Sequence, residues 1–190
     1  MDELIEIRWH GRGGQGAVTA SKLLAEAAMG AGRYFQAFPD YGPERMGAPI
    51  RAFTRLSSRP ITIHSQIAEP DVVVVLDPTL LATVPVTEGI KEDGVLLVNS
   101  ALRPAEVREA TGLQCGRVYT VDASHIAIVE IGREITNTPM LGAFARVTGL
   151  FDIEVLAEEL RAWFSGKIGA DLVNANVRAF RRAASEVQGG

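Results

Sequence analysis

A glycine-rich segment near the start of the chain constrains the fold more than any other feature of the sequence. Residues 5–17 read IEIRWHGRGGQGA, so an alternating apolar run passes into a cluster of glycines. Residues 17–29 (AVTASKLLAEAAM) then show the pattern of a helix. The glycines satisfy the spacing GxGxxG at Gly11, Gly13 and Gly16, with Gly14 as an extra. The segment predicts a strand, a glycine loop and a helix in direct succession.

This arrangement is typical of a site that binds phosphate. Glycine adopts positive φ readily and has no Cβ, so a diphosphate can approach backbone N–H groups at the positive end of the helix dipole. A GxGxxG spacing alone is weak support, and the flanking strand and helix strengthen it. The alternative is a tight strand-to-helix turn whose glycines serve packing only. The local sequence leaves both interpretations open.

The rest of the chain alternates short apolar strands with helices. Strands are predicted at residues 34–38, 49–56, 60–64, 72–76, 95–98 and 118–121, the second and third as a hairpin. The last third is predicted to be helical, with helices that begin near Thr138, Asp152 and Asp171. Because aliphatic strands alternate with helices, we expect one α/β domain over residues 1–190, a three-layer α/β/α fold with a mostly parallel, mixed sheet. The final residues, EVQGG, are expected to fray.

Polar residues end three of the predicted parallel strands: Asp77, Asn99 and Asp122. The carboxyl ends of parallel strands meet at one edge of a sheet, where ligands of open α/β folds bind. We therefore expect these side chains and Gly11 at the same edge. Helix capping is the expected role of each polar residue, because Asp and Asn readily accept from the first N–H groups of a following helix.

Composition and charge exclude several classes of function. The 190 residues carry a net charge of −4, with a pI near 5.4, which argues against nucleic-acid binding. Cys115 is the single cysteine, so this chain alone forms no internal disulfide and holds no cysteine-ligated iron–sulfur cluster or zinc ion. The sequence shows no signal peptide and no membrane span, so we expect a cytoplasmic protein without a membrane partner.

The sequence lacks the residue sets of a self-sufficient enzyme. His10, His64 and His125 are not spaced like metal ligands and are expected to be structural, and Cys115 has no basic neighbour. We therefore predict no catalytic residue and no metal site. Asp40 lies 24 residues after the last loop glycine and could hold a ribose in a dinucleotide-binding domain. The chain offers no second domain for a hydride acceptor, however.

A long loop, PDYGPERMGAP, follows the predicted strand at residues 34–38. It is rich in residues that interrupt regular structure. It also carries Tyr41, Glu44, Arg45 and Met46. Tyr, Arg and Met are enriched in the cores of protein interfaces, and a long irregular loop in a compact domain usually has a function. We predict that these four residues contact a partner chain.

Four stretches together carry a family resemblance: HGRGGQGAVTASKLLAEAA, FPDYGPERMGAPIRAFTR, AEPDVVVVLDPTLL and NTPMLGAFARVTGL. Over residues 5–155 the chain closely resembles the gamma subunits of the 2-oxoacid:ferredoxin oxidoreductases, in particular those of pyruvate:ferredoxin oxidoreductase. Glycine-rich loops are common, whereas the combination of the first two stretches is specific to this family. The segment YGPERMGAPIRAF is more similar to the pyruvate branch than to the 2-oxoglutarate branch.

The resemblance implies a role within a larger enzyme. Such complexes convert pyruvate, coenzyme A and oxidised ferredoxin to acetyl-coenzyme A, CO2 and reduced ferredoxin. They use thiamine diphosphate, Mg²⁺ and [4Fe–4S] clusters, which the resemblance assigns to partner chains, because this chain has one cysteine and no thiamine-binding motif. The partners are the alpha, beta and ferredoxin-like delta subunits, and ferredoxin is the external acceptor. The gamma chain keeps a role in assembly and a contact with coenzyme A, and is expected to be inactive alone.

The glycine loop fits this coenzyme A contact physically, so we expect the contact at Gly11, Arg12, Gly13, Gly14, Gln15 and Gly16. The diphosphate and ribose 3′-phosphate of coenzyme A suit a glycine cradle with an arginine nearby. Two alternatives remain open. One is a gamma subunit of a sister complex that acts on another 2-oxoacid or on oxalate. The other is a free-standing Rossmann-type NAD(P)-binding reductase that uses the loop glycines and Asp40.

Overall fold

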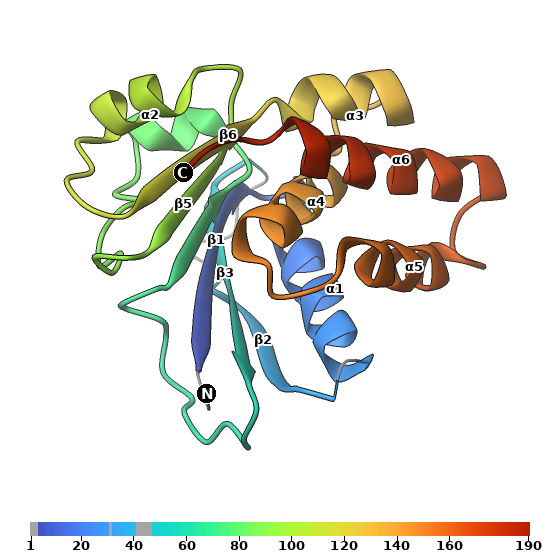
Figure 1. The fold of residues 1–190 in the computed structure, drawn as a ribbon, viewed down its shortest axis with the longest axis horizontal. Helices are drawn as coiled ribbons and strands as arrows, with labels where there is room; N and C mark the ends of the chain where they lie inside the picture. Colours follow the sequence, from blue (N-terminus) through green and yellow to red (C-terminus); the bar gives the residue numbers. More distant parts are fainter. Residues whose placement is uncertain (1–3, 31, 41–46) are drawn as a thin grey trace.

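The computed structural model describes residues 4–30, 32–40 and 47–190, and its central feature is a seven-stranded sheet (Figure 1). In chain order the strands are β1 (Ile5–Arg12), β2 (Tyr34–Asp40), β3 (Pro49–Ser57), β4 (Val72–Val75), β5 (Val95–Asn99), β6 (Arg117–Val121) and β7 (Gln188–Gly189). Across the sheet their order is β2-β3-β1-β4-β5-β6-β7. The strand that leads into the glycine loop, β1, therefore lies inside the sheet.

Strand direction divides the sheet into a parallel centre and antiparallel flanks. β1, β4, β5 and β6 are parallel to one another, whereas β3 is antiparallel to both β1 and β2, and β7 is antiparallel to β6. β4 and β5 are buried along their whole length, which explains their continuous aliphatic sequences VVVV and VLLVN. The predicted mixed α/β fold is confirmed.

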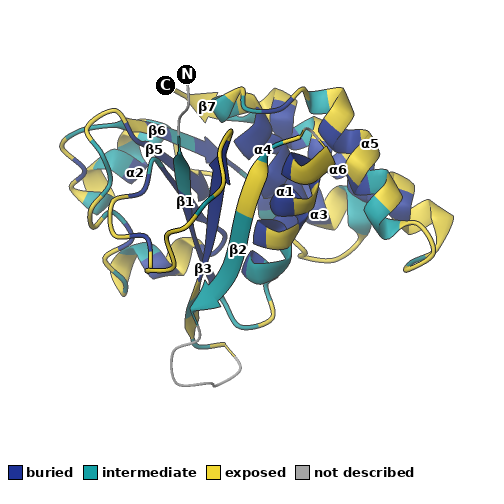
Figure 2. Ribbon diagram, turned by 90° about the horizontal axis from the view of Figure 1, so that it is seen from below, coloured by how far each residue is buried: buried dark blue, intermediate teal, exposed yellow. Residues whose placement is uncertain are grey.

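Helices cover both faces of the sheet unequally (Figure 1). They are α1 (Ala17–Gly30), α2 (Pro104–Thr111), α3 (Ala123–Ile131), α4 (Asn137–Thr148), α5 (Ile153–Phe164) and α6 (Ala170–Glu186), with a 3-10 turn, η1 (Pro78–Ala82). α1 and α3 to α6 gather on one face, over a core that includes Trp9, Leu97 and Phe144. η1 and α2 cover the other face, over a smaller core that includes Val73 and Leu96. In Figure 2 the buried sides of these helices face the sheet.

The prediction that residues 60–64 form a strand in a hairpin with β3 is wrong. β3 pairs with β2 on one side and β1 on the other, and residues 58–71 contain no strand. This segment contacts the sheet through polar groups: Arg55, which is 1% exposed, donates to the Ile63 carbonyl at 3.4 Å. Because β1 runs inside the sheet, pairing with it buries β3 more fully than a local hairpin would.

The expectation that the C-terminus frays is also wrong. β7 pairs with Tyr119 and Thr120 of β6. Gly189 has a φ of 121°, and a Cβ there would lie 2.2 Å from the Val118 carbonyl oxygen, so the approach requires glycine. Backbone pairing with a free sheet edge therefore orders the tail. Within the residues described, no helix has the length and apolar character needed to cross a membrane.

Candidate functional site

The candidate site is the glycine loop between β1 and α1, at the carboxyl edge of the parallel strands. Gly14 and Gly16 have left-handed backbones, with φ of 96° and 84°. The N–H of Gly13 donates to the Ala48 carbonyl at 3.0 Å, and the N–H of Gln15 donates to the Arg12 carbonyl at 3.0 Å. Among the described residues, the N–H groups of Gly14 and Gly16 form no hydrogen bond. The loop thus presents two backbone donors beside the first turn of α1, which contains no acidic residue.

Asp77, directly after β4, holds two side chains of the loop. Arg12 Nε and Gln15 Nε2 both donate to Asp77 Oδ2, at 3.0 and 2.8 Å. Asp77 Oδ1 accepts from the backbone N–H and the hydroxyl of Thr79, at 2.9 and 2.6 Å, and so caps η1. Burial alone would raise the pKa of Asp77, but the hydrogen bonds from Thr79 and Gln15 and the charge of Arg12 lower it overall. Asp77 is therefore a carboxylate at neutral pH.

This polar network fills the crevice between β1 and β4. The connections that leave these strands turn to opposite faces, α1 to one and η1 to the other, and such a switch point is where doubly wound sheets bind ligands. Here the Arg12–Asp77 ion pair occupies it. Arg12 also donates to the Gly47 carbonyl at 3.1 Å. The guanidinium that the sequence suggested as a phosphate contact is thus paired within the protein.

Asn137, which the sequence did not single out, lies against the loop. A Cβ on Gly16 would lie 2.8 Å from Asn137 Nδ2, so the first turn of α4 packs directly on this glycine. Asn137 is 6% exposed, its Oδ1 accepts the N–H of Thr138 at 2.9 Å, and its Nδ2 has no partner in the described part of the chain. The buried Thr138 hydroxyl also lacks a partner there. The N-terminal ends of α1 and α4 therefore meet at the loop.

The three polar residues at the strand ends lie at this edge. Asp77 and Asp122 cap the elements that follow them, as predicted, whereas the prediction for Asn99 is wrong because Arg103 is the N-cap of α2. Asp77 caps η1, and Asp122 accepts from a backbone N–H in the first turn of α3 at 2.9 Å. Asn99 links two elements, because its Nδ2 donates to the Leu76 carbonyl at 2.8 Å and its Oδ1 accepts the N–H of Ser124 at 3.1 Å. These groups stabilise the edge on which the loop stands.

His10 precedes the loop and has a structural role. It is 2% exposed, and its Nε2 accepts from Arg8 Nε at 3.1 Å. Burial, and then the charges of Arg8 and Arg51, lower the pKa of His10 to about 3. The neutral ring helps to hold Arg8, which donates to the carbonyls of Val86 and Glu88.

The remaining residues considered for chemistry do not gather at the loop. His64 and His125 are exposed, and Cys115 is half-buried. Within residues 4–30, 32–40 and 47–190, no group of three or more His, Cys, Asp and Glu side chains is arranged to hold a metal ion.

Asp40 is not placed like the ribose-binding carboxylate of a dinucleotide fold. That carboxylate belongs to a strand beside the first one. Here β2 is separated from β1 by the antiparallel β3. The Asp40 carboxylate also pairs with Arg51 at 2.6 Å. This geometry removes the acidic group on which the nicotinamide alternative depends.

The predicted interface residues Tyr41, Glu44, Arg45 and Met46 lie outside the described residues. Both ends of their loop are described. Asp40 ends β2 and pairs with Arg51, and the carbonyl of Gly47 accepts from Arg12. The loop therefore leaves and re-enters the described structure at the same sheet edge as the glycine loop.

Known proteins of one family resemble this chain along almost its whole length. A family model described as pyruvate ferredoxin/flavodoxin oxidoreductase matches residues 6–186. The chain belongs to this family. Pyruvate synthase subunit PorC of Thermotoga maritima is 51% identical over 183 residues, 96% of this chain and 94% of that protein. The pyruvate/ketoisovalerate oxidoreductases common subunit gamma of Pyrococcus abyssi is 52% identical over 179 residues, 94% of this chain and 97% of that protein.

Solved structures agree with this assignment. The crystal structure of pyruvate oxidoreductase subunit PORC from Thermotoga maritima has a TM-score of 0.88 and 47% identity, with 99% of each chain covered. A 2-oxoglutarate:ferredoxin oxidoreductase from Magnetococcus marinus shares the fold at a TM-score of 0.78 and 21% identity, and 97% of this chain matches 31% of that longer one. The resemblance to gamma subunits is confirmed, and the chain is a subunit of a multi-subunit oxidoreductase.

Proposed function

We propose that this chain is the gamma subunit of a complex that oxidises pyruvate, with coenzyme A and ferredoxin, to acetyl-coenzyme A and CO2, and that it forms part of the coenzyme A site. Pyruvate is named for relatives that are 51% and 52% identical to it. In this proposal thiamine diphosphate, Mg²⁺ and the [4Fe–4S] clusters belong to the alpha, beta and delta chains, since this sequence has one cysteine and no thiamine-binding motif. The complex works in the cytoplasm.

The observation that carries the coenzyme A contact is the pair of unbonded N–H groups at Gly14 and Gly16. Gly14 and Gly16 flank Gln15, whose own N–H is bonded within the loop. Open backbone donors of a tight turn favour an anion, and the N-terminus of α1 adds the positive end of its dipole. Asn137 Nδ2 supplies a side-chain donor beside Gly16. A phosphate anion suits clustered N–H groups at a helix N-terminus, and we assign these donors to the diphosphate of coenzyme A.

This proposal gives the six loop residues two different roles. Gly14 and Gly16 donate to the ligand. Gly13, whose N–H is bonded to Ala48, and the side chains of Arg12 and Gln15, bonded to Asp77, hold the loop in shape. Gly11 serves packing, since a Cβ there would lie 3.2 Å from the Cβ of Ala17.

The test is coenzyme A kinetics in the assembled complex. Gly14→Ala places a methyl group in open space but strains a backbone at φ 96°, which shifts the two donors. We expect the KM for coenzyme A to rise roughly 5- to 150-fold, with the KM for pyruvate unchanged. Gly112→Ala is the matched control, because Gly112 is also left-handed, at φ 65°, and open, but lies at the end of α2. An unchanged KM for coenzyme A in an intact complex would contradict the proposal.

The catalytic division of labour is tested with the chain alone. Without the thiamine-binding and cluster-binding subunits, the purified chain is expected to show no pyruvate-dependent reduction of an electron-accepting dye. Turnover by the isolated chain would contradict its role as a non-catalytic subunit. Titration with NADH should likewise show no binding, since Asp40 is paired with Arg51.

A second candidate substrate is favoured by one relative. The Pyrococcus abyssi protein, 52% identical, is named as a gamma subunit common to pyruvate and ketoisovalerate oxidoreductases. This chain would then assemble with more than one set of catalytic subunits. Reconstitution with each set from the source organism, followed by assays with pyruvate and ketoisovalerate, separates the two cases.

A further inference from the structure

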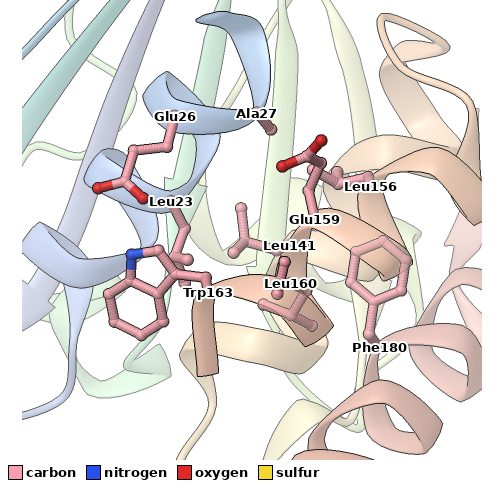
Figure 3. Close-up of a pocket in the computed structure, with 10 residues that line it drawn as sticks. Leu23, Glu26, Ala27, Leu141, Leu156, Glu159, Leu160, Trp163 and Phe180 are labelled. Atoms are coloured by element: carbon pink, nitrogen blue, oxygen red, sulfur yellow. The ribbon is translucent and has the colours of Figure 1, made fainter. Parts of the chain in front are cut away.

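A groove between α1 and α5 is not used by the proposed function (Figure 3). It has a volume of about 210 Å³, and its apolar lining comprises Leu23, Ala27, Leu141, Leu156, Leu160 and Phe180. Trp163 stands at one side, with the ammonium of Lys167 3.8 Å from its ring centroid. The α1 residues that line the groove are Leu23, Glu26 and Ala27, all at least seven residues after Gly16.

Two carboxylates that form no ion pair among the described residues stand at the rim of this groove. Figure 3 shows Glu26 of α1 and Glu159 of α5 beside the apolar floor, and both are exposed. Neither forms an ion pair or a hydrogen bond in the described part of the chain. Other glutamates of α5 differ, because Glu154 and Glu158 both pair with Arg181.

The end of α1 adds a third source of negative potential. A Cβ on Gly30, the last residue of α1, would lie 3.2 Å from Glu159 Oε1. α1 has no basic residue in its last turn, and the C-terminus of a helix carries a partial negative charge. Glu159 therefore stands where the helix repels it. The groove combines an apolar floor with two rim carboxylates that form no ion pair in the described part of the chain, although Lys167 lies on Trp163 at one side.

We propose that this groove docks a segment of another subunit of the oxidoreductase complex, which inserts an apolar side chain between α1 and α5 and places a lysine or arginine against Glu26 and Glu159. The charge of the rim selects a cation. A second copy of this chain fits poorly, because a two-fold dimer on this face would bring the same carboxylates together.

The helix faces beside the groove extend the docking surface. Met29 lies one turn after Glu26 and is 61% exposed, and Val155 lies one turn before Glu159 and is 58% exposed. Both are apolar side chains left uncovered next to the negative rim. This inference rests on membership of a multi-subunit family and not on the coenzyme A contact.

Charge reversal tests the docking. The dissociation constant of the purified chain is measured on the complex of the other subunits. Glu26→Lys with Glu159→Lys is expected to raise it roughly 10- to 100-fold. The matched control, Glu92→Lys with Glu109→Lys, changes two exposed glutamates elsewhere by the same charge and should leave it unchanged. The double variant Glu26→Gln with Glu159→Gln should raise the dissociation constant by a smaller factor. It replaces the charge-reversal variant in the test if charge reversal impairs folding.

A photo-crosslinking residue at Met29 identifies the occupant in the assembled complex. A crosslink to another subunit supports the proposal. A crosslink to a second copy of this chain, no crosslink in an intact complex, or equal dissociation constants for the groove variants and the control would overturn it. Failure of the coenzyme A proposal can be distinguished from failure of the docking proposal. The first is an unchanged KM for coenzyme A in Gly14→Ala, whereas the second is read from these dissociation constants.

Discussion

The glycine loop precedes α1, and the α1–α5 groove is lined by the middle and the later turns of the same helix. The charged groups of the two regions differ in their pairing. At the loop, the charge of Arg12 is neutralised by Asp77 at 3.0 Å, and the open donors are backbone N–H groups. At the groove, Glu26 and Glu159 form no ion pair among the described residues. The charged groups of the loop are thus paired within the chain, and its open backbone donors suit an anionic ligand. The groove is completed only from outside.

Of the changes considered, removal of the Asp77 carboxylate should have the largest effect on the stability of the chain. Asp77→Ala leaves the side chains of Arg12 and Gln15 and the capped N–H of Thr79 without their acceptor. We expect the free energy of unfolding to fall by about 2–4 kcal/mol, measured by urea denaturation. Asp40→Ala, which breaks an exposed pair with Arg51, should cost less than about 1 kcal/mol. Equal losses in the two variants would show that the network contributes little.

The two left-handed glycines provide the next test. Gly16→Ala meets Asn137 Nδ2 at 2.8 Å at a φ of 84°, whereas Gly14→Ala meets nothing within 4 Å. Gly16→Ala should therefore destabilise the chain by about 1–3 kcal/mol, and by more than Gly14→Ala. Thermal unfolding measures both. Adding Asn137→Ala should recover part of the loss in Gly16→Ala but none in Gly14→Ala, and the absence of this coupling would contradict the packing.

The buried histidine beside the loop predicts a pH dependence. His10 has a pKa of about 3 in the folded chain and 6.5 when unfolded, so the unfolded chain binds the extra proton between these values. Stability is fully present above pH 6.5 and falls with decreasing pH, by up to about 1.4 kcal/mol per unit. His10→Gln should flatten the slope between pH 6.5 and 5, where carboxylates contribute least. His125→Gln, an exposed control, should retain it.

The smallest expected effect is on stability, from removal of one charge at the rim of the groove. Glu159→Gln removes a charge that the C-terminus of α1 repels, so the free chain should gain about 0.3–1 kcal/mol of stability. The same change should weaken binding to the other subunits. Thermal unfolding of the free chain and the dissociation constant measure the two effects, with the exposed Glu109→Gln as control. A destabilised free chain would show that Glu159 has a partner within the protein.

Much of the fold could be predicted because its signals are local. Residues 5–29 contain the whole succession of an alternating strand, a glycine loop and a helix. The aliphatic runs of β4 and β5 indicate strands that are buried on both faces. Capping by Asp122 likewise depends on neighbours in the chain. The same segments carry the family resemblance.

The sequence by itself thus determined the α/β class, the glycine loop and the family, because each is encoded in short-range pattern or in motif identity. Only the tertiary structure decided the pairing of β3 with β1, the contact of Asn137 with Gly16, and the neutralisation of Arg12 by Asp77, 65 residues away. Such contacts form where distant segments compete for the same partners. The pairing that forms depends on the total burial and hydrogen bonding of the folded chain, and these leave no periodic pattern in the sequence.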